Sequence, residues 1–483
     1  MSQPIPWRDD PPCGHDVDFA YQTHYCTYIR VPRLLQLQHL LLPKRPLPSQ
    51  RPRRPDDLLL ITAFQWYELW FKVLLTDVRA ALAADPATYE PVKLLRRGIE
   101  LFKLFEQHAD LCDSLILTQP ELRQALSDAG RRPPSAQWAA IVALSRRLAR
   151  LAGQPALGLA EAVDDYQRRL KRFNARFGQF CRASLPPGDA AAPMYADWLR
   201  LPDLLNLQQA VKSDWAAAGQ APTGFYVPAP VSPDENLFVI VHQAFELWFQ
   251  VILDHLDRSV AALNADDVPA AALLAGRVAA IQRLLVPQIQ IPATMLALDF
   301  MRFRSQTLAR DGQVLHTGLT PASGTESYQF REIEIVCGLR DDPVFRTYLA
   351  GTDQLPVRLL TPRQQARLAQ TTLPEAFRAA ATRRGVGGFA ELFTLSTTPN
   401  PYLDLAVLAE SLLEFDEFFR FWRLAHVSMV EKMIGKRSGT GFLGPEYLAE
   451  TAGLRVQKHN RVFEERQARG RFFEELWVVR DGK

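Results

Sequence analysis

The sequence predicts an all-α fold made of two tandem helical units that pair within one chain. Good helix formers (Ala, Leu, Arg, Gln and Glu) dominate, apolar residues recur at helical spacing, and strand-like alternation is nearly absent. In addition, a long apolar helix is present twice, at 58–78 and at 237–256, and the copies match closely when aligned on Glu-Leu-Trp-Phe. A repeated helix of this length indicates a duplicated unit.

The repeat continues on both sides of this helix. The segment Tyr25–Gln38 recurs 170 residues later as 195–208, whereas the two Glu-Leu-Trp-Phe motifs are 178 residues apart. A weaker match relates 160–177 to 409–426 and depends on an initial Ala-Glu and on the spacing of apolar residues. The order of the matches is the same in both copies, as a tandem duplication requires.

A segment rich in proline and alanine, 184–195, separates the copies and has the composition of a linker. The first unit therefore covers roughly 18–184 and the second roughly 194–483. At 483 residues, the chain is long enough for each unit to bury its own core.

Composition argues against several classes of function. The formal charge is only +3, which gives no electrostatic reason to expect nucleic acid or an anionic membrane as a partner. The five cysteines are scattered and form no C-x-x-C pair, so we expect a reducing compartment and no zinc or iron–sulfur site. We find no signal peptide and no uninterrupted apolar stretch near the ~20 residues of a membrane span. We therefore expect a cytoplasmic protein.

Two histidines distinguish the second unit from the first. His242 lies on the repeated apolar helix, where the first copy has Phe64, and His426 lies on a later apolar helix, where the weaker alignment gives Phe177. A single histidine on an apolar helix is usually a core residue. Because both differ together between the copies, they indicate one shared site, either for a metal or for haem. The Glu-x-x-His pattern of a di-iron bundle is lacking, so haem, which needs one axial histidine and an apolar slot, fits better.

Three further features are candidates for ligand binding. Arg304 lies on an otherwise apolar helix, where it forms either a buried ion pair or a clamp for a carboxylate. A glycine loop at 435–441 contains Thr440 and follows the His426 helix. This loop is not a phosphate-binding Walker motif, because Lys436 is followed by arginine. A second loop, at 320–327, is either a binding loop or a simple turn.

These motifs occur together in a known family. The second unit resembles tryptophan 2,3-dioxygenases, haem enzymes that open the indole ring of tryptophan with O2. The resemblance rests on five motifs in the family's order: F-x-x-x-H-Q-x-x-E-L-W-F at 238–249, F-R at 303–304, P-x-S-G at 321–324, H-x-x-M-V-E-x-x-I-G at 426–435 and G-T-G at 439–441. It covers nearly all of 194–450.

The resemblance implies a haem site in the second unit. His426 is similar to the axial ligand of the iron of heme b, and Ser323 to the serine of the distal loop near the haem. His242 is similar to the distal histidine that faces the indole N–H. The first unit has neither histidine, so the resemblance implies one haem per chain.

The resemblance also implies how a tryptophan-like amino acid binds. Arg304 is similar to the arginine that clamps its carboxylate, Thr440 to the residue that holds its amino and carboxyl groups, and Phe238 to the aromatic wall beside the indole. In the family, an N-terminal segment of one subunit caps its neighbour's pocket. Here the corresponding residues of the first unit are Tyr25, Tyr28 and Ile29.

The duplication implies an assembly as well. Because the family works as an oligomer, we expect the two units to form an intramolecular pseudo-dimer, and two chains to form a homodimer that acts as a pseudo-tetramer. The first unit is then a haem-less pseudo-subunit that supplies the cap.

The sequence departs from the family at two places near the pocket. Phe300 replaces an aromatic residue with a hydroxyl, and 305–320 is an insertion between two motifs. We expect a dioxygenase that opens the C2–C3 bond of L-tryptophan or a close derivative, giving an N-formylkynurenine-type product. Two alternatives remain: a haem oxygenase that modifies an indole or aromatic amino acid without ring opening, and a haem-based sensor. The substrate-binding residues argue against the sensor.

Overall fold

The computed structural model describes most of the helical part of the chain. The described residues are 25–38, 57–116, 135–184, 195–208, 211–214, 223–226, 233–310, 313–318, 327–341, 360–394, 400–435, 452, 454–455, 464–465 and 471–480.

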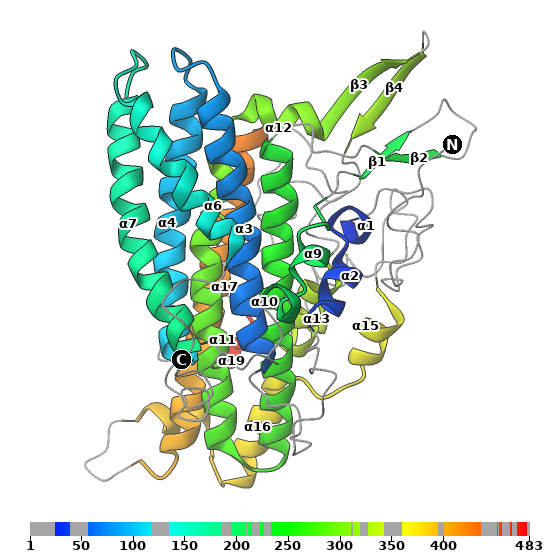
Figure 1. The fold of residues 1–483 in the computed structure, drawn as a ribbon. Helices are drawn as coiled ribbons and strands as arrows, with labels where there is room; N and C mark the ends of the chain where they lie inside the picture. Colours follow the sequence, from blue (N-terminus) through cyan, green and yellow to red (C-terminus); the bar gives the residue numbers. More distant parts are fainter. Residues whose placement is uncertain are drawn as a thin grey trace.

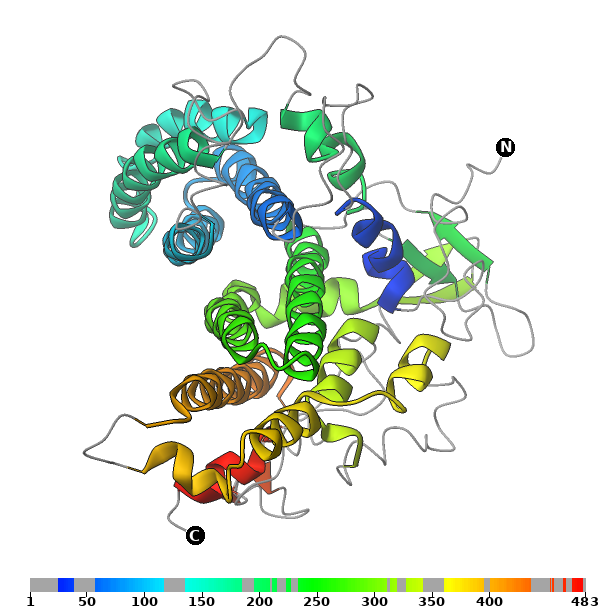
Figure 2. The same cartoon turned by 90° about the horizontal axis from the view of Figure 1, so that it is seen from below.

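Long helices form the body of the molecule and confirm the all-α prediction. They are α3 (Asp57–Ala83), α4 (Glu90–Leu115), α7 (Leu159–Ser184), α10 (Pro233–Asn264), α11 (Val268–Gln288) and α17 (Leu403–Ile434). Helix α10 lies at the centre, with α3 on one side and α11 and then α17 on the other (Figures 1 and 2). Helix α4 packs between α3 and α7. Helices α3 and α10 contain the two copies of the repeated sequence, and they pack against one another.

Shorter helices surround these long ones. They are α1 (Tyr25–Ile29), α2 (Val31–Gln36), α6 (Ala136–Ser145), η1 (Arg146–Leu151), α8 (Tyr195–Trp198), α9 (Leu201–Leu204), η2 (Ile291–Thr294), α12 (Ala297–Arg304), α13 (Tyr328–Val336), η4 (Leu339–Asp341), α15 (Pro362–Arg367), α16 (Leu373–Arg383), η5 (Phe389–Phe393) and α19 (Glu474–Arg480).

Three antiparallel hairpins add a small amount of strand that the sequence analysis did not expect. They pair β1 (Val211–Asp214) with β2 (Thr223–Tyr226), β3 (Ser305–Arg310) with β4 (Gln313–Gly318), and β5 (Leu454–Arg455) with β6 (Glu464–Glu465). The β3–β4 hairpin occupies the 305–320 insertion and begins directly after α12. It projects from one end of the bundle, beside β1–β2 (Figure 1).

The short N-terminal helices of the two units have the same local structure. Helices α1 and α2 are joined at Arg30, which has φ of 57°, and α8 and α9 are joined at Arg200, which has φ of 52°. A left-handed backbone is unfavourable for a residue with a side chain. Both joints are followed by a proline in the first turn of the next helix. The same unusual turn is therefore present at both positions of the repeat.

Each N-terminal segment contacts the long helix of the opposite unit. The Tyr25 hydroxyl donates to Glu246 Oε1 on α10 at 2.8 Å, and the Tyr195 hydroxyl donates to Glu68 Oε1 on α3 at 2.9 Å. These tyrosines and glutamates are corresponding residues of the repeat. The contacts are thus reciprocal, as in a two-fold arrangement.

Two corresponding glutamines repeat this exchange. Gln243 Nε2 on α10 donates to the carbonyl of Ile29 at 2.9 Å, and Gln65 Nε2 on α3 donates to the carbonyl of Leu199 at 3.1 Å. All four residues are buried. Because buried carbonyls at helix ends need donors, these bonds fix each short helix pair against the opposite long helix.

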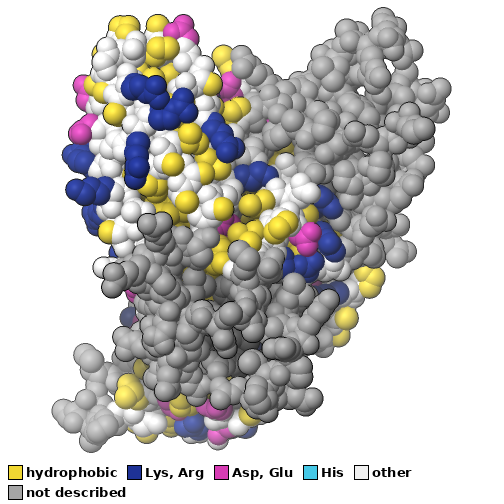
Figure 3. All heavy atoms as spheres, in the orientation of Figure 1, with side chains coloured by type: hydrophobic (Ala, Val, Ile, Leu, Met, Phe, Trp, Pro, Cys, Tyr) yellow, Lys and Arg dark blue, Asp and Glu magenta, His cyan; other side chains and the backbone are white. Residues whose placement is uncertain are grey.

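Among the described residues, three helical segments are long and apolar enough to cross a membrane by length and composition. They are Leu58–Ala83, Pro233–Asn264 and Val268–Thr294. Their most apolar windows are 89%, 83% and 61% buried inside the protein, so the apolar surface is used in packing between helices. On the face shown in Figure 3, the described side chains are a mixture of basic, acidic, apolar and uncharged types.

Gly98 and Gly276 are corresponding residues of the repeat, but the space around them differs. A Cβ on Gly98 of α4 would lie 2.6 Å from Tyr166 Cε2, whereas a Cβ on Gly276 of α11 would find Ser411 Oγ at 3.7 Å as its nearest neighbour. We expect Gly98→Ala to lower the free energy of unfolding by about 1–3 kcal/mol, because overpacking forces the helices apart. Denaturant unfolding measures this change.

The control for this prediction is Gly276→Ala. At this position alanine adds helix propensity without a clash, so stability should stay the same or rise by about 0.5–1 kcal/mol. Equal effects of the two substitutions would contradict the difference in packing.

Candidate functional site

The protonation of His242 follows from its position on α10. Its Nδ1 lies 2.7 Å from the carbonyl oxygen of Phe238, one turn earlier. A carbonyl only accepts, so Nδ1 carries the hydrogen and donates it. Burial lowers the pKa of His242 to about 4, and the bond to Phe238 offsets this only in part. At neutral pH the ring is therefore uncharged, and Nε2 carries a lone pair that can accept a hydrogen bond.

His426 lies on α17. Burial lowers its pKa to about 4, and the second cause is the positive charge that His242 would carry. The two imidazoles are therefore near enough to interact electrostatically, although they come from helices far apart in sequence. The shared site that the sequence analysis predicted for these histidines stays a prediction. A neutral imidazole is also the form that binds a metal.

The residues around His426 fit a haem group. Trp422, one turn earlier, lies 5.4 Å from the His426 ring between ring centres and also contacts Phe245 and Phe330. Its Nε1 is buried and has no hydrogen-bond partner among the described residues. An N–H without a described partner beside a half-buried imidazole, within apolar walls, fits a planar group with a polar edge. Within the described ranges no three or more His, Cys, Asp or Glu side chains are grouped as metal ligands.

The corresponding region of the first unit is filled. Phe177 occupies the position of His426 and is fully buried. Its ring lies 5.1 Å from Tyr67, 5.2 Å from Phe71 and 5.6 Å from Phe173 between centres. Phe177 is thus one of four aromatic rings packed together, and no imidazole stands at this position.

The predicted cap residues lie against the His242 site. The Tyr25 ring is 5.7 Å from the His242 ring, and Tyr28 is 6.3 Å from Phe238. Ile29 holds the segment in place through its carbonyl, which accepts from Gln243. Burial, and then the nearby carboxylate of Glu235, raise the pKa of Tyr28 well above its ordinary value, so its hydroxyl stays protonated. All three predicted residues come from the same chain as His242.

Helix α12 carries the predicted carboxylate clamp at its C-terminal end. Its last residue is Arg304, whose side chain is outside the described part of the structure, as are Ser323 and Thr440 altogether. Earlier on this helix, Phe300 and Phe303 lie 5.8 Å and 5.6 Å from Phe238 between ring centres. Helix α12 is therefore packed against the same part of α10 that carries the distal site.

One buried residue beside this site was missed by the sequence analysis. Glu246 accepts from Tyr25 and, at 2.7 Å, from Gln329 Nε2 on α13. Burial raises the pKa of Glu246, and these hydrogen bonds oppose that rise. The signal was present in the sequence, because the glutamate of Glu-Leu-Trp-Phe is repeated inside an apolar helix in both copies.

The first unit builds the same arrangement around its own glutamate. Gln137 Nε2 on α6 donates to Glu68 Oε2 at 2.8 Å. Tyr195 completes the set, and its ring lies 5.8 Å from Phe64 between centres, as Tyr25 lies against His242. The hydrogen bonds around the glutamate are thus present twice, whereas His242 is replaced by Phe64 in the first copy.

Comparison with known proteins agrees with this geometry. A family model for tryptophan 2,3-dioxygenase matches residues 187–393. A tryptophan 2,3-dioxygenase of Nocardioides sp. is 34% identical over 257 residues, which are 51% of this chain and 84% of the relative. The chain belongs to the tryptophan 2,3-dioxygenase family. This is a family of haem-dependent oxidoreductases that use O2.

A second relative shows how the family's length compares with this chain. A tryptophan 2,3-dioxygenase of Herpetosiphon aurantiacus is 30% identical over 298 residues, which are 96% of the relative but only 59% of this chain. Nearly a whole tryptophan 2,3-dioxygenase thus corresponds to little more than half of the sequence. The family model matches residues in the second unit, where His242 lies.

The lowered pKa of His242 gives a test of its surroundings. A folded-state pKa of about 4, against an ordinary value of 6.5, means that the unfolded chain binds a proton in this range and the folded chain does not. The contribution of His242 to the free energy of unfolding is therefore complete above pH 6.5. It decreases toward pH 4, by at most about 1.4 kcal/mol per pH unit for one proton. His242→Phe should reduce this pH dependence in denaturant unfolding of the haem-free protein.

Phe64→Leu is the matched control, because it changes the corresponding position without removing a titrating group. It should keep the pH dependence of the wild type. If His242→Phe also kept it, the proton uptake would have to come from other groups.

Proposed function

We propose that this protein is a haem-dependent dioxygenase that opens the C2–C3 bond of the indole of L-tryptophan or a close derivative. The observation that carries the proposal is the pair His242 and His426, two imidazoles near enough for a charge on one to lower the pKa of the other, in a chain of this family. The remaining residues of the site bind and orient the substrate, since positioning is the main contribution of the protein in cofactor chemistry.

Heme b is the cofactor in this proposal. His426 would hold its iron, and the Trp422 Nε1–H, which has no partner among the described residues, would be available to a polar group of the haem. The haem supplies the activation of O2. Buried rings such as Phe245 exclude water from the group, and Ser323 belongs to the loop expected on its distal side.

The substrate lies between α10 and α12 in this proposal. His242 Nε2, which is an acceptor at neutral pH, accepts the hydrogen of the indole N–H, and Phe238 forms the apolar wall beside the ring. Arg304 binds the substrate carboxylate, and Thr440 binds the amino-acid end. The indole is then held at both ends.

The first unit (18–184) is a haem-less pseudo-subunit in this proposal, and the second (194–483) is catalytic. The reciprocal contacts of Tyr25 with Glu246 and of Tyr195 with Glu68 support a pseudo-dimer within one chain. The cap of the catalytic site, Tyr25, Tyr28 and Ile29, then comes from the first unit.

A second function is favoured by one specific feature. Phe300 lies 5.8 Å from Phe238 and brings a hydrocarbon ring to a position where the family often has a hydroxyl. An enzyme that inserts one oxygen atom, without ring opening, into an indole or aromatic amino acid would suit a less polar pocket. The product therefore has to be identified.

Aerobic turnover with labelled oxygen tests the function. The reduced haem-loaded protein is incubated with L-tryptophan under 18O2, and products are identified by mass. Ring opening should give a product with both labelled atoms and the absorbance of N-formylkynurenine. A product with one labelled atom would favour the second function, and the absence of any product from tryptophan or its ring-substituted derivatives would overturn both.

Haem content tests the assignment of the units. We expect one haem per chain, and His426→Ala should lose most of it because the axial ligand is gone. Phe177→Leu should retain haem, and its stability should fall by about 1–2 kcal/mol as in other core substitutions. Absorbance per chain gives the ratio. Two haems per chain would contradict the proposed haem-less unit.

The two corresponding tyrosines separate catalysis from stability. Tyr25→Phe and Tyr195→Phe each remove one hydrogen bond to a buried glutamate, so each should lower the free energy of unfolding by about 1–3 kcal/mol. Only Tyr25 caps the catalytic site, so only Tyr25→Phe should also lower kcat/KM for tryptophan. Equal loss of activity in both variants would contradict the role of the first unit as the cap.

A further inference from the structure

We propose that Lys93 and Arg97 of the first unit are positioning residues for the substrate site of the second unit. They fix the first turn of α12 relative to the first turn of α10. Helix α12 carries Arg304 at its other end, and helix α10 carries His242. This inference deepens the proposed function and rests on it for the role of Arg304.

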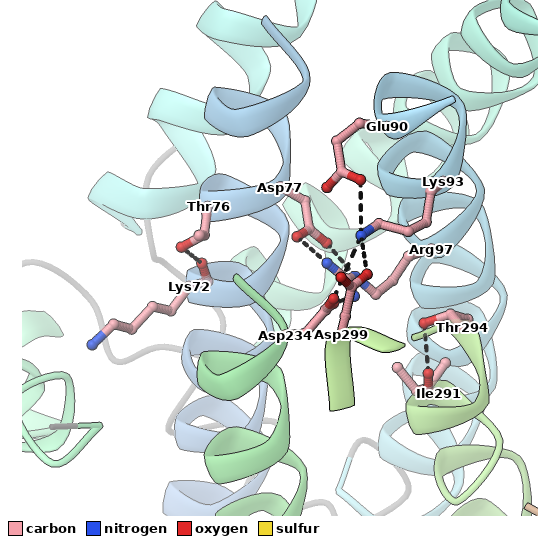
Figure 4. Close-up of polar contacts among 10 residues, drawn as sticks. All are labelled: Lys72, Thr76, Asp77, Glu90, Lys93, Arg97, Asp234, Ile291, Thr294 and Asp299. Carbon is pink, nitrogen blue, oxygen red and sulfur yellow. Dashed lines mark hydrogen bonds and ion pairs between the residues drawn. The ribbon is translucent and has the colours of Figure 1, made fainter. Parts of the chain in front are cut away.

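The geometry is a buried group of charges at the meeting point of four helices (Figure 4). Arg97 on α4 makes two bonds to Asp77 on α3, at 2.7 Å and 2.6 Å, and a third to Asp234 on α10. Lys93 Nζ, one turn earlier on α4, lies 2.9 Å from Asp299 Oδ2 on α12 and 3.4 Å from Asp234 Oδ2. Two cations of the first unit thus bind carboxylates on both substrate-facing helices.

The charges are hidden from water, so their partners matter. The exposed fraction is 0% for the Arg97 side chain, 2% for Asp77 and Asp234, 6% for Lys93 and 13% for Asp299. A buried charge that loses its partner is strongly unfavourable. Burial lowers the pKa of Lys93, but its carboxylate partners outweigh burial and raise it, so the ammonium stays charged. The group therefore permits only arrangements of the helices in which every charge is paired.

The apolar contacts of α12 constrain its position and rotation less than the charged hydrogen bonds do. Phe300 and Phe303 pack against Phe238, and apolar rings tolerate sliding and rotation more easily than a charged hydrogen bond does. Asp299 lies five residues before Arg304, about 7.5 Å along a helix that is only eight residues long. A displacement at Asp299 is therefore transmitted to Arg304 with little loss.

The other copy of this helix pair shows that the fold does not need the charges. At the repeat offset of 178, the residues that correspond to Asp77, Lys93 and Arg97 are His255, Ala271 and Ala275. All three are buried. Helices α10 and α11 therefore pack against one another without such a group. The charged version occurs only where the first unit meets the helices of the proposed catalytic site.

The test compares Lys93→Met with Lys93→Arg in the haem-loaded full chain. Lys93→Met removes the charge and keeps most of the stem, so KM for tryptophan should rise by about tenfold or more, because small misplacements of a binding group have large effects. Haem content should not change, since His426 lies on α17 outside this group of charges. Lys93→Arg should restore KM to within a few-fold of the wild type.

A second readout does not depend on activity. Backbone amides of α12, measured by hydrogen exchange and mass spectrometry, should exchange faster in Lys93→Met than in the wild type, whereas those of α17 should not. Lys103→Met is the matched control: this lysine is on the same helix and forms an exposed pair with Glu100 at 2.7 Å. It should change neither KM nor exchange in α12.

The double variant Lys93→Met/Asp299→Leu addresses the possibility that a single variant does not fold. It replaces both partners by apolar groups, which is often nearly neutral for stability. It should fold, bind haem and still show the raised KM and the faster exchange in α12. Unchanged KM in a folded, active Lys93→Met protein, or unchanged exchange in α12, would overturn the inference.

Failure of the proposed function would look different. A wild-type protein that neither turns over tryptophan nor shifts its haem absorbance when tryptophan is added would overturn that function. Exchange in α12 would still decide whether Lys93 fixes this helix.

Discussion

Two buried carboxylates hold the molecule together. Glu68 and Glu246 lie within the apolar helices α3 and α10, where an unsatisfied carboxylate would be strongly unfavourable. Each takes one donor from the short N-terminal segment that crosses from the opposite unit and one from a glutamine on a following helix of its own unit. The buried glutamate of each long helix therefore depends on hydrogen-bond donors from other segments of the chain. This requirement places α1 and α2 beside His242 as directly as it places α8 and α9 beside Phe64.

The side chains around Phe177 differ from those around His426 mainly in polarity. Around Phe177, aromatic rings pack edge to face and leave no space, and the first unit gains the stability of a closed core. Around His426, the imidazole and the Trp422 Nε1, which has no hydrogen-bond partner among the described residues, place polar groups within an otherwise apolar region. Such polar groups are usual where a ligand binds.

Sequence reasoning succeeded where a pattern is local and failed where distant charges meet. Helical periodicity predicted the all-α class, and the Glu-Leu-Trp-Phe helices that the sequence repeats are both long helices of the structure. The grouping of Lys93 with Asp299 could not be predicted, because charged residues on an amphipathic helix are ordinarily solvated and nothing local marks this pair as buried. The insertion at 305–320 was recognised, but its pairing as β3–β4 depends on a register that the sequence did not make evident.

The origin of Tyr25 has a consequence for how the site behaves on dilution. A cap supplied by a separate subunit is lost when the subunits dissociate, so its occupancy depends on protein concentration. Tyr25 and His242 belong to one polypeptide, and the effective concentration of the cap at the site is set by the connecting chain alone. Contact within one chain thus depends on folding and not on an equilibrium of association. The closed site is then as persistent at the few molecules of a poorly expressed protein as at high abundance.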